Sequence, residues 1–324
     1  MHARKEVLLH KFLFYWLLTS EFDKYSNGDP SKGALYPAIG EKDLLNGVIP
    51  IPSIEEQALI IKKIDTAFSS LDTIDTLQGQ YQDNLATLKS KIIDAGIQGK
   101  LTEQLPEDGT AEELYQQIQQ EKFALEKAGK IKKSKPLPPI SDEEKPFDIP
   151  DNWKWVHLAE LCKIINGDRG KNYPAKSTLK KQGIPFISAQ NLDGRTVIND
   201  DDMFCMSDAQ YQRLGSGKLQ MDDIVICIRG SLGKHGRYPF ETGAIASSLV
   251  ICRPYLSAKV LNDYIMLWLD SALFFDEIGK YDNGSAQPNL AANNLEKFFI
   301  PLPPLAEQKR IVAKLEELLP LCEG

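Results

Sequence analysis

Two basic segments carry the side chains best suited to bind a large anionic ligand. Residues 163–181 contain six Lys and Arg residues and a single acid, Asp168. A second, glycine-rich segment holds Arg229, Lys234 and Arg237. Lysine and arginine in loops neutralise phosphates, whereas the forked side chains of Arg, Asn and Gln can pair with base edges. The two segments together therefore favour binding to nucleic acid.

The candidate DNA contacts are the polar residues of these segments and of two further loops. They are Arg169, Lys171, Asn172, Tyr173, Lys176, Gln190, Asn191, Arg229, Lys234, Arg237, Gln287 and Asn289. The Arg, Asn and Gln side chains suit base edges, the lysines suit phosphates, and Tyr173 could stack or pack beside a base. Taken singly, each is equally well explained as a solvated loop residue or a turn-former.

Motifs for catalysis are missing from the sequence. It contains no G-x-x-x-x-G-K-[ST] loop, no G-x-G-x-x-G fingerprint and no Asp/Asn-Pro-Pro-Tyr/Phe segment. The four histidines lack metal-ligand spacing, and Asp222-Asp223 is better explained as a turn before a strand than as a magnesium site. We therefore expect a non-catalytic chain with no metal and no cofactor of its own.

Composition narrows the class of protein further. The chain has 324 residues, 42% of them hydrophobic, which suggests more than one folded part. Its net charge of −7 argues against a protein that coats nucleic acid non-specifically. Five cysteines without a C-x-x-C pair predict neither disulfides nor a zinc site, and they favour a cytoplasmic location. The apolar residues 12–18 are too short to span a bilayer and indicate a core helix.

A repeat relates the two ends of the chain. Ile49-Pro50-Ile51-Pro52, followed by Glu56-Gln57, reappears as Ile300-Pro301-Leu302-Pro303, followed by Glu307-Gln308, with an offset of 251 residues. An apolar-periodic stretch follows each copy. The pattern predicts two related units, each of which leads into a helix.

The first of these helices is predicted to be long. Ser53 and Glu56 form a capping-box pattern, and no proline interrupts residues 54–105. Apolar residues recur at spacings of three and four, and the helix-packing candidates are Ile61, Ile64, Phe68, Leu71, Leu85, Leu88 and Ile92. A narrow stripe on such a helix favours a coiled coil. A helix lying along a globular surface is the alternative.

The remaining segments complete the predicted domain organisation. Thr110 and Glu113 open a short helix, and basic, proline-rich residues 130–139 form a linker that either is solvated or touches phosphates. A globular α+β unit with a mixed or antiparallel sheet follows, with strands over 184–189, 224–228 and 245–251 and a helix over 259–278. The predicted segments are 1–52, 53–105 (long spacer helix), 106–148 (short helix and linker), 149–303 (globular unit) and 304–324 (start of a second helix).

This order of parts resembles the DNA-specificity subunit of type I restriction–modification enzymes. The motifs are Trp153-Lys154-Trp155-Val156 with Leu158, residues 183–187 (GIPFI), residues 284–290 (GSAQPNL) and residues 301–308 (PLPPLAEQ). The resemblance covers nearly the whole chain and implies target-recognition domains held by coiled-coil spacer helices. Residues 1–52 resemble only the closing part of a first recognition domain, and the last spacer helix stops early.

The resemblance implies a non-catalytic, sequence-specific DNA-recognition subunit. Its partners would be double-stranded DNA, a methyltransferase (modification) subunit and a restriction translocase, which use S-adenosylmethionine, ATP and magnesium. A homodimer through the spacer helices would supply the missing surface. The alternatives are a coiled-coil scaffold protein, an inactive recombination-cassette fragment and, less favoured, a metal-dependent nuclease.

Overall fold

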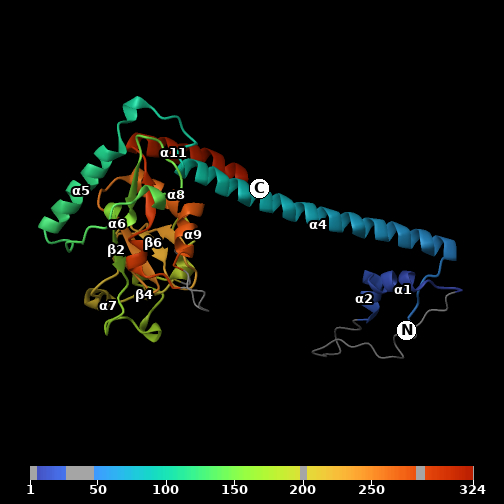
Figure 1. Cartoon of the computed structure of the whole chain (residues 1–324). Helices are drawn as coiled ribbons and strands as arrows, with labels where there is room; N and C mark the ends of the chain where they lie inside the picture. Colours follow the sequence, from blue (N-terminus) through green and yellow to red (C-terminus); the bar gives the residue numbers. More distant parts are fainter. Residues whose placement is uncertain (1–5, 27–46, 198–202, 282–288, 324) are drawn as a thin grey trace. The chain divides into compact units, whose positions relative to one another are not determined.

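The computed structural model describes residues 6–26, 47–197, 203–281 and 289–323 (Figure 1). The chain forms two compact units, Met1–Asp83 and Asn84–Gly324. Helix α4 (Ile54–Ile97) begins in the first unit and ends in the second.

In the first unit, helix α1 (His10–Leu17) packs against the start of α4, and α2 (Ser20–Ser26) follows it. The fully buried amide of Gln57 ties the entering chain to α4, because its Oε1 accepts the Leu9 N–H at 2.8 Å and its Nε2 donates to the Val7 carbonyl at 2.9 Å. Tyr15 and Lys11 both contact the carboxylate of Asp65. These contacts fix α1 on α4 by polar groups as well as by apolar packing.

Helix α4 has 44 residues, which corresponds to about 66 Å at 1.5 Å per residue. The hydroxyl of Ser53 accepts the Glu56 N–H at 3.2 Å, so the predicted N-terminal cap is present. The helix ends at Ile97 and does not run to residue 105. Gly99 takes a φ of +71°, which stops the helix there, and a Cβ on Gly99 would lie 2.5 Å from Pro150.

The second unit contains the sheets. Its strands are β1 (Lys154–His157), β2 (Cys162–Asn166), β3 (Ile184–Ile187), β4 (Cys205–Met206), β5 (Lys218–Leu219), β6 (Ile224–Cys227), β7 (His235–Arg237), β8 (Gly243–Ile245), β9 (Leu249–Pro254) and β10 (Phe299–Leu302). Within the described residues they form sheets in the orders β1-β10, β2-β9-β6-β7 and β4-β3-β8-β5. Only β3 and β8 pair in parallel among these strands. The predicted α+β fold with a mixed or antiparallel sheet is confirmed.

Helices cover the sheets and provide the rest of the core. They are α5 (Ala111–Lys127), α6 (Leu158–Leu161), α7 (Asp208–Arg213), α8 (Lys259–Leu269), α9 (Ala272–Gly279), α10 (Ala292–Leu295) and α11 (Leu305–Leu318), with 3₁₀ turns η2 (Pro106–Asp108), η3 (Asp142–Glu144), η4 (Lys176–Thr178), η5 (Ala189–Asn191) and η6 (Leu319–Cys322). The predicted capping box of Thr110 and Glu113 opens α5. Trp268 and Phe298 lie fully buried in the main core.

Two predicted elements are each split in the structure. The predicted strand 245–251 is interrupted at residues 246–248, which join β8 to β9. The predicted helix 259–278 breaks after Leu269, because the Ser271 hydroxyl accepts the Phe274 N–H and caps the new helix α9. Phe275 on α9 is 50% exposed.

The two copies of the repeat share one local geometry. The Gln57 Nε2 donates to the Pro52 carbonyl at 2.9 Å, and the Gln308 Nε2 donates to the Pro303 carbonyl at the same distance. Both glutamines are fully buried at the start of a helix. The sequence repeat is therefore also a structural repeat.

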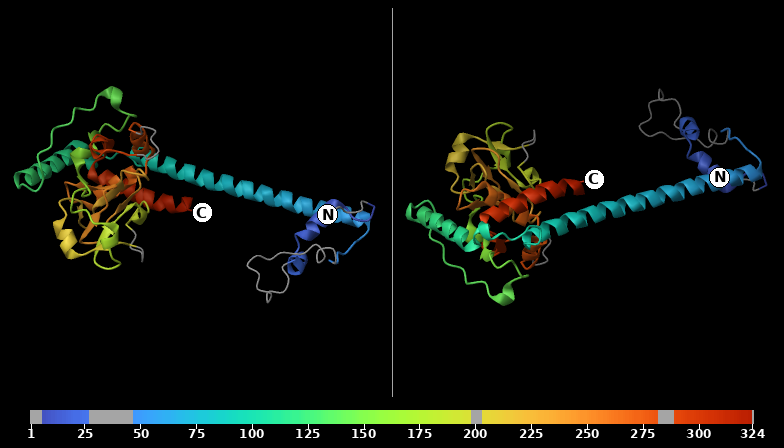
Figure 2. Two further views of the ribbon diagram at one scale, coloured as in Figure 1. Left: turned by 90° about the horizontal axis from the view of Figure 1, so that it is seen from below. Right: turned by 90° about the horizontal axis from the view of Figure 1, so that it is seen from above.

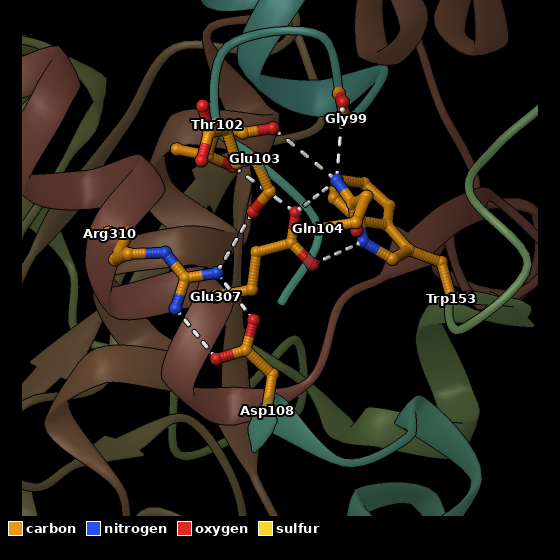
Figure 3. Close-up of polar contacts among 8 residues, drawn as sticks. All are labelled: Gly99, Thr102, Glu103, Gln104, Asp108, Trp153, Glu307 and Arg310. Atoms are coloured by element: carbon orange, nitrogen blue, oxygen red, sulfur yellow. Dashed lines mark hydrogen bonds and ion pairs between the residues drawn. The ribbon is translucent and has the colours of Figure 1, made fainter. Parts of the chain in front are cut away.

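A buried carboxylate ties α11 to the rest of the second unit (Figure 3). Glu307 accepts hydrogen bonds from Trp153 Nε1 at 2.7 Å and from Gln104 Nε2 at 2.6 Å. Three residues on, Arg310 forms a two-pronged ion pair with Asp108, with Nη1 to Oδ1 at 2.7 Å. The start of the globular unit, the turn after α4 and α11 are thus joined around these two side chains.

Candidate nucleic-acid interface

The sheet topology brings several polar loops to one edge of the second unit. Strands β3 and β8 are parallel and end together at Ile187 and Ile245. Strands β2 and β6 flank β9, and both end opposite its first residues, with Asn166 beside Val250 and Cys227 beside Leu249. The loops that follow β2, β3, β6 and β8 therefore leave from the same edge of the domain.

The first basic loop, residues 167–181, is shaped by its single acid. The Asp168 carboxylate accepts the Gly170 N–H at 2.7 Å and the Gly215 N–H at 2.8 Å. These backbone hydrogen bonds, led by the one from Gly170, lower the pKa of Asp168 below its ordinary value. The acid thereby orders the loop that presents Lys171 and Asn172, which are both exposed.

Two residues of this loop form hydrogen bonds with the β8–β9 turn. The Arg169 guanidinium donates to the Ser247 carbonyl at 3.2 Å, and the Tyr173 hydroxyl accepts the Ser247 N–H at 3.5 Å. The Tyr173 ring also packs edge-on against Phe186. Tyr173 is 37% exposed, so the ring retains only part of its surface for a ligand. The Lys176 ammonium lies 5.8 Å from the ring centre of Phe204.

The second loop pairs an arginine with an asparagine. Arg229 Nε donates to Asn289 Oδ1 at 2.9 Å, and both residues are exposed. Within the described residues, the two terminal nitrogens of Arg229 make no hydrogen bond, so its fork is available for an acceptor pair. Lys234, half-buried, lies farther along the same loop.

The structure connects the two loops through the turn between β8 and β9. The Ile228 N–H donates to the Ser248 carbonyl at 2.9 Å, while Ser247 contacts Arg169 and Tyr173. Sequence reasoning does not identify Ser247 and Ser248, because the pattern of residues 245–251 predicts one continuous strand. The adjacent pair of serines within that run was the available signal.

Two candidates have structural roles in place of ligand contacts. Asn191 is 6% exposed, and its Oδ1 accepts the Ser188 N–H at 3.0 Å. Arg237 donates to Asp263 at 2.6 Å, and its side chain is 20% exposed. We therefore remove both from the candidate DNA contacts. Gln190 is exposed at the same edge, and Gln287 lies outside the described residues.

The helix-packing candidates on α4 differ in exposure. Ile61, Ile64, Leu85 and Ile92 are half-buried, while Phe68, Leu71 and Leu88 are exposed. The rings of Phe68 and Tyr15 stack at 5.9 Å. Ile93 and Ile97, which were not selected from the sequence, are the buried contacts of α4 with the core of the second unit.

The described residues contain no group of three His, Cys, Asp or Glu side chains that could hold a metal ion. Among the helices of these residues, none is both long and apolar enough to cross a membrane. All five cysteines are unpaired and buried.

Fold and site together define an α+β module with polar loops gathered at one sheet edge, joined to a long helix. A family model, the type I restriction modification DNA specificity domain, matches residues 150–322, more than half of the chain. The chain therefore belongs to the family of type I restriction–modification specificity proteins, as the sequence motifs indicate.

Curated relatives agree with this assignment. The chain is 32% identical to the EcoAI specificity subunit of Escherichia coli over 274 residues, which are 83% of this chain and 44% of that protein. It is 29% identical to the EcoEI specificity subunit of the same organism over 286 residues, with the same coverage. The chain thus spans less than half the length of these two relatives.

Solved structures show the same fold. A chain from a study of complex assembly and conformational transition in the type I R-M system aligns over 100% of this chain and 66% of its own length, with a TM-score of 0.65 and 21% identity. The HsdS subunit from Thermoanaerobacter tengcongensis aligns over 100% of this chain and 65% of its own length, with a TM-score of 0.54 and 21% identity.

Proposed function

We propose that this chain is a cytoplasmic, non-catalytic subunit that recognises a DNA sequence through the loops at the edge of its second unit. Arg169, Asn172, Gln190, Arg229 and Asn289 are the proposed base readers, with Gln287 kept from the sequence. Lys171, Lys176 and Lys234 are the proposed phosphate contacts. The observation that carries this proposal is the convergence of the loops after β2, β3, β6 and β8 at one edge, in a chain of the specificity family.

The chemistry is assigned to partner subunits. A methyltransferase subunit would use S-adenosylmethionine, and a restriction translocase would use ATP and magnesium. Residues 1–52 would then be the end of a first recognition domain, residues 53–105 the spacer segment, residues 106–148 the connector, residues 149–303 the recognition domain and residues 304–324 the start of a second spacer. The exposed apolar residues of α4 would pair with a helix of a second copy.

The Arg229–Asn289 pair supports base readout most directly. Holding Nε on Asn289 leaves the end of the guanidinium free, and a bidentate contact of Arg with guanine is worth about 1–3 kcal/mol of discrimination. A half-buried Lys234 on the same loop suits a phosphate, which carries no sequence information.

The test is selection of bound DNA sequences by the chain together with its methyltransferase partner, followed by competition with two variants. Arg229→Ala should relax the preference at one base pair. Lys234→Ala should weaken all sequences alike and reduce the slope of log affinity against log salt by about 1. Absence of any sequence preference in the wild-type complex would refute the proposal, and a scaffold role would then be favoured.

A further inference from the structure

A lysine-lined cleft lies on the second unit beside the recognition loops. Its outer wall is the arm, which we define as residues 111–140: helix α5 and the extended segment that returns from it (Figure 2). Its inner wall is formed by α6, β2 and neighbouring residues of the globular domain. The cleft has a volume of about 1220 Å³.

The arm is anchored to the domain at two places. On α5, the Tyr115 hydroxyl donates to Glu160 Oε1 at 2.7 Å and Gln119 Nε2 donates to the Glu160 carbonyl at 2.9 Å. Farther along, the Pro138 carbonyl lies 3.1 Å from His157 Nε2. The intervening residues are therefore held over the domain between two attachment points.

Four of the lysines that line the cleft have no hydrogen bond or ion pair among the described residues. The lining includes Lys122, Lys132, Lys133, Lys135, Lys163 and Lys297. Lys122 is engaged with the Ala159 carbonyl and the Tyr255 ring. For Lys132, Lys133, Lys135 and Lys163, no hydrogen bond or ion pair is found in the part of the chain that the structure describes.

The acids of the cleft are fewer and already occupied. Glu160 accepts the Tyr115 hydroxyl and the His157 N–H, and Glu126 accepts the Ser134 N–H at 3.4 Å. Burial raises the pKa of Glu296, which disfavours its charged form. The cleft therefore keeps an excess of positive charge that no side chain lining it neutralises.

Crowding of like charges supports the same conclusion. Burial lowers the pKa of Lys163, and the neighbouring positive charges of Arg253 and Lys132 lower it further. An anion between Lys163 on β2 and Lys132 on the arm would relieve this repulsion. The ligand that fits such a cleft is a polyanion.

Continuity with the recognition loops identifies the kind of polyanion. The lining extends to Asn166, Gly215 and Ser216, and the Ser216 hydroxyl donates to the Asn166 carbonyl at 2.7 Å. Gly215 in turn donates to Asp168 in the first basic loop. One end of the cleft thus opens at the base of the loop proposed to contact the target.

We propose that this cleft binds the phosphate backbone of DNA flanking the recognised sequence. The inference rests on the proposed function, because it extends the same bound duplex beyond the target. An acidic protein segment fits less well, because one end of the cleft opens at the loop that is proposed to contact DNA. The contacts add affinity without sequence preference, because lysine binds phosphate as a point charge.

The test compares two duplexes, one limited to the selected target and one with about 15 extra base pairs on each side, which adds about 51 Å of duplex to each flank at 3.4 Å per base pair. The variant Lys132→Gln/Lys135→Gln removes two cleft lysines. The control Lys127→Gln/Lys130→Gln removes two lysines of the same arm that do not line the cleft. Both variants carry the same net charge, so general electrostatic effects on affinity are matched.

We expect the cleft variant to weaken binding of the long duplex by about tenfold and to reduce its salt slope by about 2. Its affinity for the short duplex and its sequence preference should match those of the wild type, as should both affinities of the control. If the wild type recognises the short duplex but gains nothing from the flanks, the cleft proposal is wrong and the proposed function stands.

Equal weakening by the two variants would also overturn the cleft proposal. Binding of fluorescent polyglutamate to the wild type but not to the cleft variant would overturn it too, if the two proteins bind DNA with the same affinity. If the wild type binds neither duplex, both proposals fail together.

Discussion

Glu307 and Glu56 occupy the same position in the two copies of the repeat, but their surroundings differ. Glu307 is fully buried and accepts hydrogen bonds from Trp153 and Gln104, whereas Glu56 is exposed. The same residue type at the same helix position is thus an anchor in one copy and a solvated first-turn acid in the other. Burial and donors, not the motif, decide the role.

Replacing Glu307 with Ala should lower the free energy of unfolding by about 2–4 kcal/mol. The reason is that the buried Trp153 Nε1 loses its acceptor, at about 1–3 kcal/mol, and that the hydrogen bond from the exposed Gln104 amide, worth about 1 kcal/mol, is lost as well. Glu56→Ala, the matched control, should change it by less than about 0.5 kcal/mol. Urea unfolding followed by tryptophan fluorescence measures both, and equal effects would contradict the assigned role of Glu307.

The ion pair of Arg310 with Asp108 makes part of the stability dependent on pH. The hydrogen bonds from Arg310 lower the pKa of Asp108, whose side chain is 3% exposed. A carboxyl group with a lowered folded pKa contributes stability that is fully present above its unfolded pKa of about 3.9 and is lost as the pH falls through the folded pKa.

We therefore expect Arg310→Met to destabilise the protein by about 1–3 kcal/mol at pH 7. The difference from the wild type should narrow as the pH falls below about 4, because Asp108 is then protonated earlier in the variant. Urea midpoints measured between pH 7 and pH 3 check this. A difference that stays constant down to the lowest pH would show that packing of the arginine stem, and not the ion pair, carries the effect.

At the scale of elements, local patterns predicted more of the fold than of the site. The long helix, both capping boxes and each copy of the repeat could be predicted, because each depends on residues within a few turns of one another. The assignment of β8 and β9 to different sheets could not, because it depends on their pairing with β3 and β6, although the serine pair marks the interruption between them.

The candidate DNA contacts, too, could be predicted only in part from the sequence. Residue type correctly placed Lys171, Asn172 and Gln190 on exposed loops, but it could not distinguish them from Asn191, whose amide caps a 3₁₀ turn, or from Arg237, which meets Asp263 on α8. Asp263 lies far from Arg237 in the sequence, and the contact of Asn191 depends on the exact geometry of its turn. Side-chain type alone carries no information about either.

Gly167, the first residue of the first basic loop, lies close to the backbone of the β8–β9 turn. A Cβ on Gly167 would lie 2.6 Å from the Ala246 carbonyl oxygen, so Gly167→Ala must move the backbone that joins the loop to the β8–β9 turn. We expect DNA affinity to fall about tenfold, since a displacement of roughly 1 Å misaligns the polar contacts (about 1.4 kcal/mol).

The control for this variant is Gly215→Ala. Its Cβ would meet Asp168 at 3.6 Å, which is an ordinary contact, and its N–H is retained for Asp168. Its affinity, measured by fluorescence anisotropy, should stay near the wild-type value. If Gly167→Ala binds as the wild type does, this edge is not the recognition surface.

At the scale of the whole molecule, part of the apolar side of α4 is exposed within the described residues. Helix α11 packs on the end of α4, where a Cβ on Gly96 would lie 3.1 Å from Leu315, and Lys89 pairs with Glu323 at 3.7 Å. Preceding these contacts, Leu71, Ile74, Leu77 and Tyr81 are each more than half exposed. In a chain of the specificity family, a helix of another copy is the proposed cover.

The variant Leu71→Glu/Leu77→Glu tests this assignment. Burying an apolar side chain of this size on association is worth about 1.5–3 kcal/mol, so two charges in the stripe should weaken self-association at least a hundredfold. The control Ser69→Glu/Thr76→Glu places the same charges on the opposite face of the helix and should associate as the wild type does. Sedimentation velocity over a range of concentrations measures both constants. If the wild type and both variants stay monomeric up to high micromolar concentration, pairing between copies is ruled out. The exposed apolar residues of α4 would then be assigned to contact with a partner subunit.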